Sequence, residues 1–179
     1  MNNLATDLAR LHVLEGADFV KQLKAIAASE EFHPLEDDNN IFTTGGEKQE
    51  DYDNLINAAR KAVELGYKVY ILPNPRSVRT ADFIFEQHGI YKMYELKTIQ
   101  GKASVGNRLF DSIGQTHHVL LNIKTSYNAG RLASEIKAYF QQYFKAREVL
   151  IFKGKQVITI KREFAMKKSF IVEFRKRYR

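Results

Sequence analysis

The fold is decided by the segment ADFIFEQHGIYKMYELK, which covers residues 81–97. Aromatic and β-branched residues on both sides of His88-Gly89 are typical of a β-hairpin. If these two residues form the turn, directly opposed residues have numbers that add to 177, so Asp82 faces Glu95 on one side of the sheet. A three-residue loop would shift this sum to 178 and turn Asp82 to the other face.

The chemistry of this hairpin depends on Asp82, Glu95 and Lys97. Lys97 follows Glu95 by two residues, so the alternation of a strand places both side chains on the same face. Opposed carboxylates repel each other, and a divalent cation such as Mg²⁺ or Mn²⁺ would offset this repulsion. The pattern therefore predicts a metal site in which Lys97 positions a water or stabilises charge on a phosphate. The structural alternative is that Lys97 only pairs with one acid at a solvated edge.

Composition limits the class of protein. The chain has 179 residues, of which 44% are hydrophobic, and this is enough for one folded domain with a core and a small extension. It has no cysteine, which excludes disulfides, thiolate metal sites and a cysteine nucleophile. No apolar stretch approaches the roughly 20 residues that span a bilayer, and no signal peptide is recognisable. We expect no membrane association and a cytoplasmic site of action.

Positive charge is concentrated at the C-terminal end. Residues 153–179 contain ten Lys or Arg and two acids, interleaved with aromatic residues. This pattern predicts contacts with the phosphate backbone of a nucleic acid, although a solvated basic face is the simpler alternative. The residues expected to bind nucleic acid here are Lys161, Arg162, Lys167, Lys168 and Arg175.

Hydrophobic periodicity predicts a mixed α/β protein. Helices are expected over residues 4–14, 17–29, 52–65, 104–118 and 129–145. Strands are expected over residues 67–72, 81–87, 90–99, 119–123, 149–152 and 157–160, with an edge strand over 170–174. The acidic residues 30–50 are expected to form a loop. We therefore divide the chain into an N-terminal helical extension with an acidic linker (1–50) and a domain with a mixed central sheet flanked by helices (51–179).

The order α-β-β-β-α-β, with Asp82 on the second strand and Glu95-Leu96-Lys97 on the third, resembles the PD-(D/E)XK nuclease superfamily and its restriction-endonuclease-like core. More narrowly, the chain is similar to the C-terminal tRNase domains of contact-dependent growth inhibition toxins. This likeness rests on Asn57-Ala58-Ala59, residues 65–69, Ala81-Asp82-Phe83-Ile84, Glu95-Leu96-Lys97 and residues 115–122.

The resemblance implies a role for each matching residue. Asp82, Glu95 and the Leu96 carbonyl would bind Mg²⁺ or Mn²⁺, and Lys97 would orient the attacking water. Arg108 and Gln115, on the helix that follows, would hold a phosphate or the metal-bound water.

Two positions depart from the family pattern. The residue before Asp82 is Ala81 where the pattern has proline, a residue that shapes the backbone and carries no chemistry. The first helix has Asn57 where the toxin domains have glutamate, which leaves Asp53 or Glu64 on the same helix face as substitutes. Asn57 lowers the expected metal affinity, because an amide carries no negative charge.

These observations leave several functions open. The leading expectation is a metal-dependent nuclease acting on nucleic acid, and the toxin resemblance implies tRNA or other RNA whereas the wider superfamily implies DNA. A toxin would have an immunity protein as partner and would be delivered into the cytoplasm of a target cell. The alternative is a non-catalytic nucleic-acid-binding or assembly module of a mobile element or prophage. The N-terminal helices would dock a partner, dimerise or pack on the core.

Overall fold

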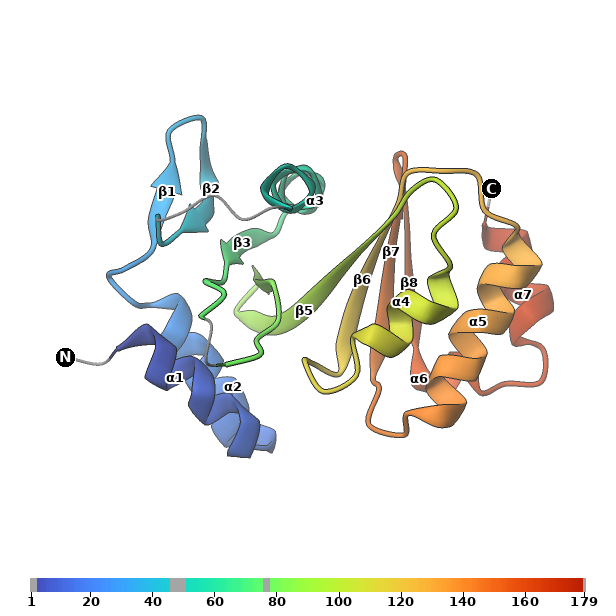
Figure 1. Ribbon diagram of the computed structural model, residues 1–179, viewed down its shortest axis with the longest axis horizontal. Coiled ribbons are helices and arrows are strands. Elements are labelled where there is room, and N and C mark those ends of the chain that lie inside the picture. The colour runs from blue at the N-terminus through green and yellow to red at the C-terminus, as the bar shows by residue number, and fades with distance from the viewer. Residues whose placement is uncertain (1–2, 46–50, 76–77, 179) are drawn as a thin grey trace. The chain divides into compact units, whose positions relative to one another are not determined.

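The computed structural model (Figure 1) describes residues 3–45, 51–75 and 78–178 of a mixed α/β chain. Neighbouring strands of its mixed sheet follow the order of the sequence, and helices pack on them. The chain divides into two compact units, Met1–Tyr94 and Glu95–Arg179. The boundary falls inside strand β5 (Ile90–Ile99), which is therefore shared by both units.

The first unit contains a mostly antiparallel set of strands. These are β1 (His33–Leu35), β2 (Asp38–Thr43), β3 (Lys68–Ile71), β4 (Phe83–Gln87) and the first half of β5. Strand β2 runs parallel to β3, and the other neighbours are antiparallel. The helices of this unit are α1 (Leu4–Arg10), the 3-10 helix η1 (Leu11–Val13), α2 (Gly16–Ala27) and α3 (Tyr52–Glu64).

Helices α1 and α2 pack on the strands of the first unit. Leu8 of α1 and Ile26 of α2 share a buried cluster with Ile84 of β4 and Met93 of β5, which face each other in the ladder. Apolar residues recur every three or four positions on both helices, so each helix presents one stripe to the sheet. The structure therefore shows the N-terminal helices packed within the chain, which was one of the roles expected for them.

The second unit has a parallel core. The second half of β5 and the strands β6 (His118–Ile123) and β7 (Glu148–Lys153) are parallel, and β8 (Gln156–Lys161) returns antiparallel to β7. Parallel neighbours need crossover connections, which α4 (Val105–Asp111) and α5 (Ala129–Gln142) provide. The chain ends with α6 (Arg162–Ala165) and α7 (Phe170–Arg177).

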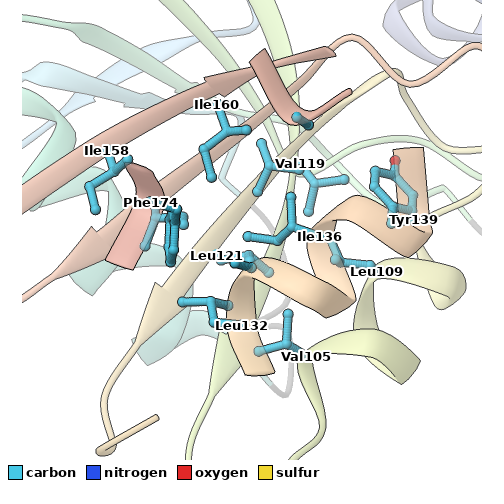
Figure 2. Close-up of a cluster of buried hydrophobic side chains, with 14 of the residues drawn as sticks. Val105, Leu109, Val119, Leu121, Leu132, Ile136, Tyr139, Ile158, Ile160 and Phe174 are labelled. Carbon is cyan, nitrogen blue, oxygen red and sulfur yellow. The ribbon is translucent and has the colours of Figure 1, made fainter. Parts of the chain in front are cut away.

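One face of these strands is covered by α4, α5 and α7 (Figure 1). Leu132 and Ile136 of α5 are fully buried in the same cluster as Leu109 of α4, Leu121 of β6 and Phe174 of α7 (Figure 2). Full burial of such side chains contributes about 1.5–3 kcal/mol each. This cluster fixes the positions of the strands that carry the candidate site.

The predicted order of elements from residue 52 to residue 160 is confirmed, but the loop expected over residues 30–50 is wrong. Residues 33–43 form β1 and β2. Ile41 is fully buried and pairs with Val69 of β3, while the Phe42 ring stacks on Tyr70 with centroids 4.9 Å apart. The surrounding charges hide these two apolar residues from a periodicity argument. Residues 46–50, part of the expected linker, lie outside the described residues.

The edge strand predicted over residues 170–174 is also wrong, because these residues begin helix α7. Phe170, Phe174 and Tyr178 recur every four positions, and all three are buried in the core of the second unit. Arg175, Lys176 and Arg177 lie in the last turn, where positive charge interacts favourably with the helix dipole. A short apolar run fits the periodicity of a helix or of a strand. Packing against α5 favours the helix here.

Candidate functional site

Glu95 and Lys97 form an ion pair on one face of β5. The Lys97 Nζ donates to Glu95 Oε1 at 2.8 Å. Glu95 pairs with Val119 and Lys97 with Leu121, and both partners belong to the core under α4 and α5. Because registered neighbours point to the same side of a sheet, the carboxylate and the ammonium lie on this helix-covered face. The prediction that they share a face is confirmed.

This pair is largely shielded from solvent. The side chains of Glu95 and Lys97 are 6% and 15% exposed. Removing a carboxylate and an ammonium from water costs several kcal/mol for each ion, and mutual attraction repays this cost only with good geometry. Lys97 is therefore not the solvated edge residue of the structural alternative. Leu96, whose carbonyl was expected to bind metal, has its side chain buried on the opposite face.

The hairpin that carries Asp82 has the predicted register. His88 and Gly89 form a two-residue turn with φ angles of 53° and 77°, as a type I′ turn requires. Phe83 pairs with Tyr94 and Gln87 with Ile90, so each pair of numbers adds to 177. The Asp82 amide donates to the Tyr94 carbonyl at 3.1 Å. The described ladder ends with Tyr94, where the first unit ends, and the pairing of Asp82 with Glu95 stays a prediction.

The Asp82 backbone is held on both sides. Its carbonyl accepts a hydrogen bond from the Leu72 amide at 2.8 Å, in addition to the bond that its own amide donates to Tyr94. The residue is half-buried and lies directly before β4. These backbone bonds connect Asp82 to the residue after β3 and to the first half of β5.

A hard divalent cation needs oxygen donors, and carboxylates are the usual protein ligands. Within residues 3–45, 51–75 and 78–178, no group of three or more His, Cys, Asp or Glu side chains is gathered for a metal ion. Mg²⁺, however, often uses one or two carboxylates and completes its shell with water and substrate phosphate. Within the second unit, Glu95 supplies one carboxylate of this kind, and the Leu96 carbonyl is a further oxygen donor on the same strand.

The three candidates on helix α3 are all exposed. Asp53, Asn57 and Glu64 lie on the outer face of the helix, whose buried side is formed by alanines and Leu55. On that outer face Arg60 pairs with Asp37 at 2.6 Å, with half or more of each side chain exposed. Asp53 and Glu64 are therefore solvated acids on the surface of the first unit, and Asn57 is exposed on the same helix.

Gln115 does not lie on a helix, which corrects the prediction for residues 104–118. Helix α4 ends at Asp111, and Gly114 adopts a φ of 90° in the turn that follows. Gln115 therefore shares no helix face with Arg108, which is exposed on α4. The Gln115 Oε1 is buried and accepts no hydrogen bond from any described residue. This turn leads into β6 at His118, one residue before the Val119 that pairs with Glu95.

The basic residues at the C-terminal end differ in their surroundings. The Arg162 guanidinium donates hydrogen bonds to the carbonyls of Tyr143 and Ala146, at 3.1 and 3.5 Å. It therefore stabilises the segment between α5 and β7. The other predicted contacts are exposed on the end of β8, the α6–α7 turn and α7. They are Lys161, Lys167, Lys168 and Arg175.

Sequence reasoning missed a polar network around Glu135 of α5. Its carboxylate accepts hydrogen bonds from Tyr127 Oη at 2.6 Å, Arg131 Nε at 3.2 Å and Ser104 Oγ at 3.4 Å. Burial, followed by the hydrogen bond to Glu135, raises the pKa of Tyr127. The spacing of Arg131 and Glu135 is an ordinary helical pair, so only the fold reveals that three separate segments meet there.

Comparisons with protein-family models, with curated proteins and with solved structures gave no match to this chain. None of the helices in the described residues is long and apolar enough to cross a membrane.

Proposed function

We propose that this protein is a divalent-metal-dependent nuclease of the PD-(D/E)XK type, which hydrolyses phosphodiester bonds in nucleic acid. The observation that carries the proposal is the ion pair of Glu95 and Lys97, held at 2.8 Å on the helix-covered face of β5. An ion pair that is so little exposed is costly to keep for stability alone, because both charges are removed from water.

The chain would divide the work among three groups. Glu95 and Asp82 would supply carboxylates to Mg²⁺ or Mn²⁺, with the Leu96 carbonyl as a further ligand. The metal would neutralise the scissile phosphate and lower the pKa of a bound water. Of the described residues only Glu95 accepts a hydrogen bond from Lys97, so two N–H bonds of its ammonium remain to orient a water or a phosphate oxygen.

The exposed lysines and arginines of residues 161–177 support nucleic acid as the substrate. Lys161, Lys167, Lys168 and Arg175 are exposed, as contacts with a phosphate backbone require. With tRNA as substrate, the protein would act in the cytoplasm, and an immunity protein would protect the cell that makes it. We propose RNA as the first substrate and DNA as the second.

The test is an incubation of the purified chain with total tRNA, single-stranded DNA and plasmid, each with Mg²⁺, with Mn²⁺ and with EDTA. We expect cleavage of one substrate that EDTA abolishes and that Glu95→Gln or Asp82→Asn reduces by at least about a hundredfold, the scale of losing a transition-state contact. Glu163→Gln, which removes an exposed acid on α6, is the matched control and should keep full activity. Cleavage that persists in EDTA or in Glu95→Gln would contradict the proposal.

A non-catalytic nucleic-acid-binding module remains the second candidate, and the exposed amide of Asn57 favours it. Such a module would bind RNA or DNA equally well in EDTA and in Mg²⁺. It would also leave every substrate intact under all three conditions.

A further inference from the structure

A small pocket lies where two parallel strands of the second unit end. It is formed by Gly101–Ala103, which follow β5, by Ser126–Asn128, which follow β6, and by Arg131 in the first turn of α5. Both connections lie at the same edge of the strands (Figure 1). Ligands of open α/β sheets commonly bind outside the carboxyl ends of the strands. None of these residues is among those expected from the sequence to form a site.

Several hydrogen-bond donors around this pocket are unused. The Lys102 ammonium, the Ser126 hydroxyl and the two terminal amino groups of Arg131 donate to no described residue. They come from three separate segments, and two of the three carry positive charge. No acidic residue lines the pocket. This arrangement suits an anion that accepts several hydrogen bonds at once.

The Glu135 network holds the pocket in shape. Glu135 binds Arg131 through Nε, which leaves the terminal nitrogens of the guanidinium to other partners. The guanidinium also lies over the Tyr127 ring at 5.4 Å, and the Tyr127 hydroxyl accepts from the Val105 amide at 3.1 Å. The Asn128 side chain accepts from the Arg131 amide at 2.9 Å. These contacts reduce the entropy that Arg131 would lose on binding a ligand.

The volume of the pocket is about 170 Å³. An ordered water needs roughly 10–15 Å³ on the same scale, so a tetrahedral oxyanion with part of its substituent can enter. Arg175 of α7 adjoins this site, because its Cδ lies 3.9 Å from the position of a Cβ on Gly130 in the first turn of α5. Lys102 and Arg131 thus line the pocket, and Arg175 adds a third positive charge beside the first turn of α5.

We propose that this pocket binds a phosphate group of the nucleic-acid strand, at a position that flanks the scissile bond. The inference rests on the proposed function, because that function identifies the phosphate as part of a nucleic acid. Lys97 precedes Gly101 by four residues, which span at most roughly 13 Å, because the strand ends at Ile99 and Gly101 lies in a turn. A nucleic-acid strand whose scissile phosphate lies at Lys97 would therefore place another of its phosphates, a few nucleotides from the scissile one, in the pocket.

The first test is a titration of the full-length, ¹⁵N-labelled chain with inorganic phosphate in EDTA. We expect amide shifts confined to Gly101–Ala103 and Ser126–Arg131. The double variant Lys102→Gln/Arg131→Gln should weaken phosphate binding by at least about tenfold, since hydrogen bonds between charged groups are lost. The control Lys145→Gln/Arg147→Gln removes the same charge from exposed residues before β7, at the opposite edge of the strands, and should bind phosphate as the parent does. Amide shifts elsewhere in the chain, or an equal loss of phosphate affinity in both variants, would contradict phosphate binding in this pocket.

The second test uses labelled oligonucleotides in EDTA, one with and one without a terminal phosphate. We expect the pocket variant to lower the slope of log K against log salt by about one relative to the parent, as the loss of a phosphate contact does. If only the terminally phosphorylated oligonucleotide responds, the site recognises a free end rather than an internal phosphate, which overturns the flanking position. Glu95→Gln should keep phosphate binding. Binding in the pocket without any cleavage by the parent would refute the proposed function alone, whereas cleavage without such binding would refute this inference alone.

Discussion

Strand β5 and helix α3 both carry residues expected to form the site, but their polar side chains lie in different surroundings. On β5 the Lys97–Glu95 pair is 15% and 6% exposed, whereas on α3 Arg60 and its partner Asp37 are 51% and 61% exposed. The exposed pair has the shorter distance, 2.6 Å against 2.8 Å. Burial, and not the distance, therefore decides what each pair contributes, because water screens the exposed one.

The largest expected effect breaks the buried pair. Lys97→Met removes the ammonium that pairs with the buried Glu95 carboxylate, and we expect the free energy of unfolding to fall by about 3–5 kcal/mol. Urea unfolding at pH 7 measures this change. The double variant Glu95→Leu/Lys97→Met should recover stability to within about 1 kcal/mol of the parent and should cut no substrate. A loss below 1 kcal/mol in the single variant would remove the contrast between the two pairs.

The second effect concerns the core beneath β5. Burial raises the pKa of Tyr139 to about 12, against a smaller opposing influence of Ser112, whose own hydroxyl donates to the Leu109 carbonyl at 2.6 Å. The pKa is higher in the folded state than the usual value of 10, so this group costs no stability below pH 10. Above pH 10 the unfolded chain loses the proton first, and stability falls by about 1.4 kcal/mol per pH unit until pH 12.

Tyr139→Phe isolates this contribution. The Tyr139 hydroxyl has no hydrogen-bond partner among the described residues. We therefore expect the variant and the parent to have the same free energy of unfolding at pH 8. Between pH 9 and pH 11 the parent should lose about 1 kcal/mol more than the variant, as measured by urea unfolding. An equal loss in both proteins would show that Tyr139 ionises as easily in the folded state as in the unfolded chain.

The exposed pair gives a smaller effect. Asp37→Asn removes the partner of Arg60, and we expect a cost of at most about 1 kcal/mol at low salt. In 1 M NaCl the difference from the parent should nearly vanish, because the screening length is then about 3 Å. Thermal unfolding at the two salt concentrations measures it. A cost above 2 kcal/mol that salt does not change would mean that this pair is as well shielded as that of β5.

The smallest effect on stability is expected from Asn57→Glu, which sharpens the role of α3. Substitution at this exposed position should change the free energy of unfolding by less than about 0.5 kcal/mol. If α3 supplies the acid that the family pattern has there, the added carboxylate should lower the Mg²⁺ concentration needed for half-maximal cleavage. An unchanged Mg²⁺ dependence would exclude this face of α3 from the site.

Local chemistry made the hairpin of β4 and β5 predictable. A turn of His88 and Gly89 accepts positive φ angles at both positions, and the alternation of the strands then sets which residues oppose each other. The strands β6 and β7 were predictable as well, because short continuous hydrophobic runs indicate buried strands. The elements that were missed depend on distant partners: Ile41 and Phe42 of β2 need β3, and Phe174 of α7 needs the core on α5.

The sequence by itself determined the order of elements from residue 52 to residue 160, the register of the central hairpin and the shared face of Glu95 and Lys97, because turns and strand alternation act over a few residues. Only the tertiary structure decided that this pair is buried, that the acids of α3 are exposed, and that Lys102, Ser126 and Arg131 meet at one pocket. Both the burial of a side chain and the meeting of separate loops depend on how crossover connections bring distant segments together. No local sequence pattern encodes contacts between such segments.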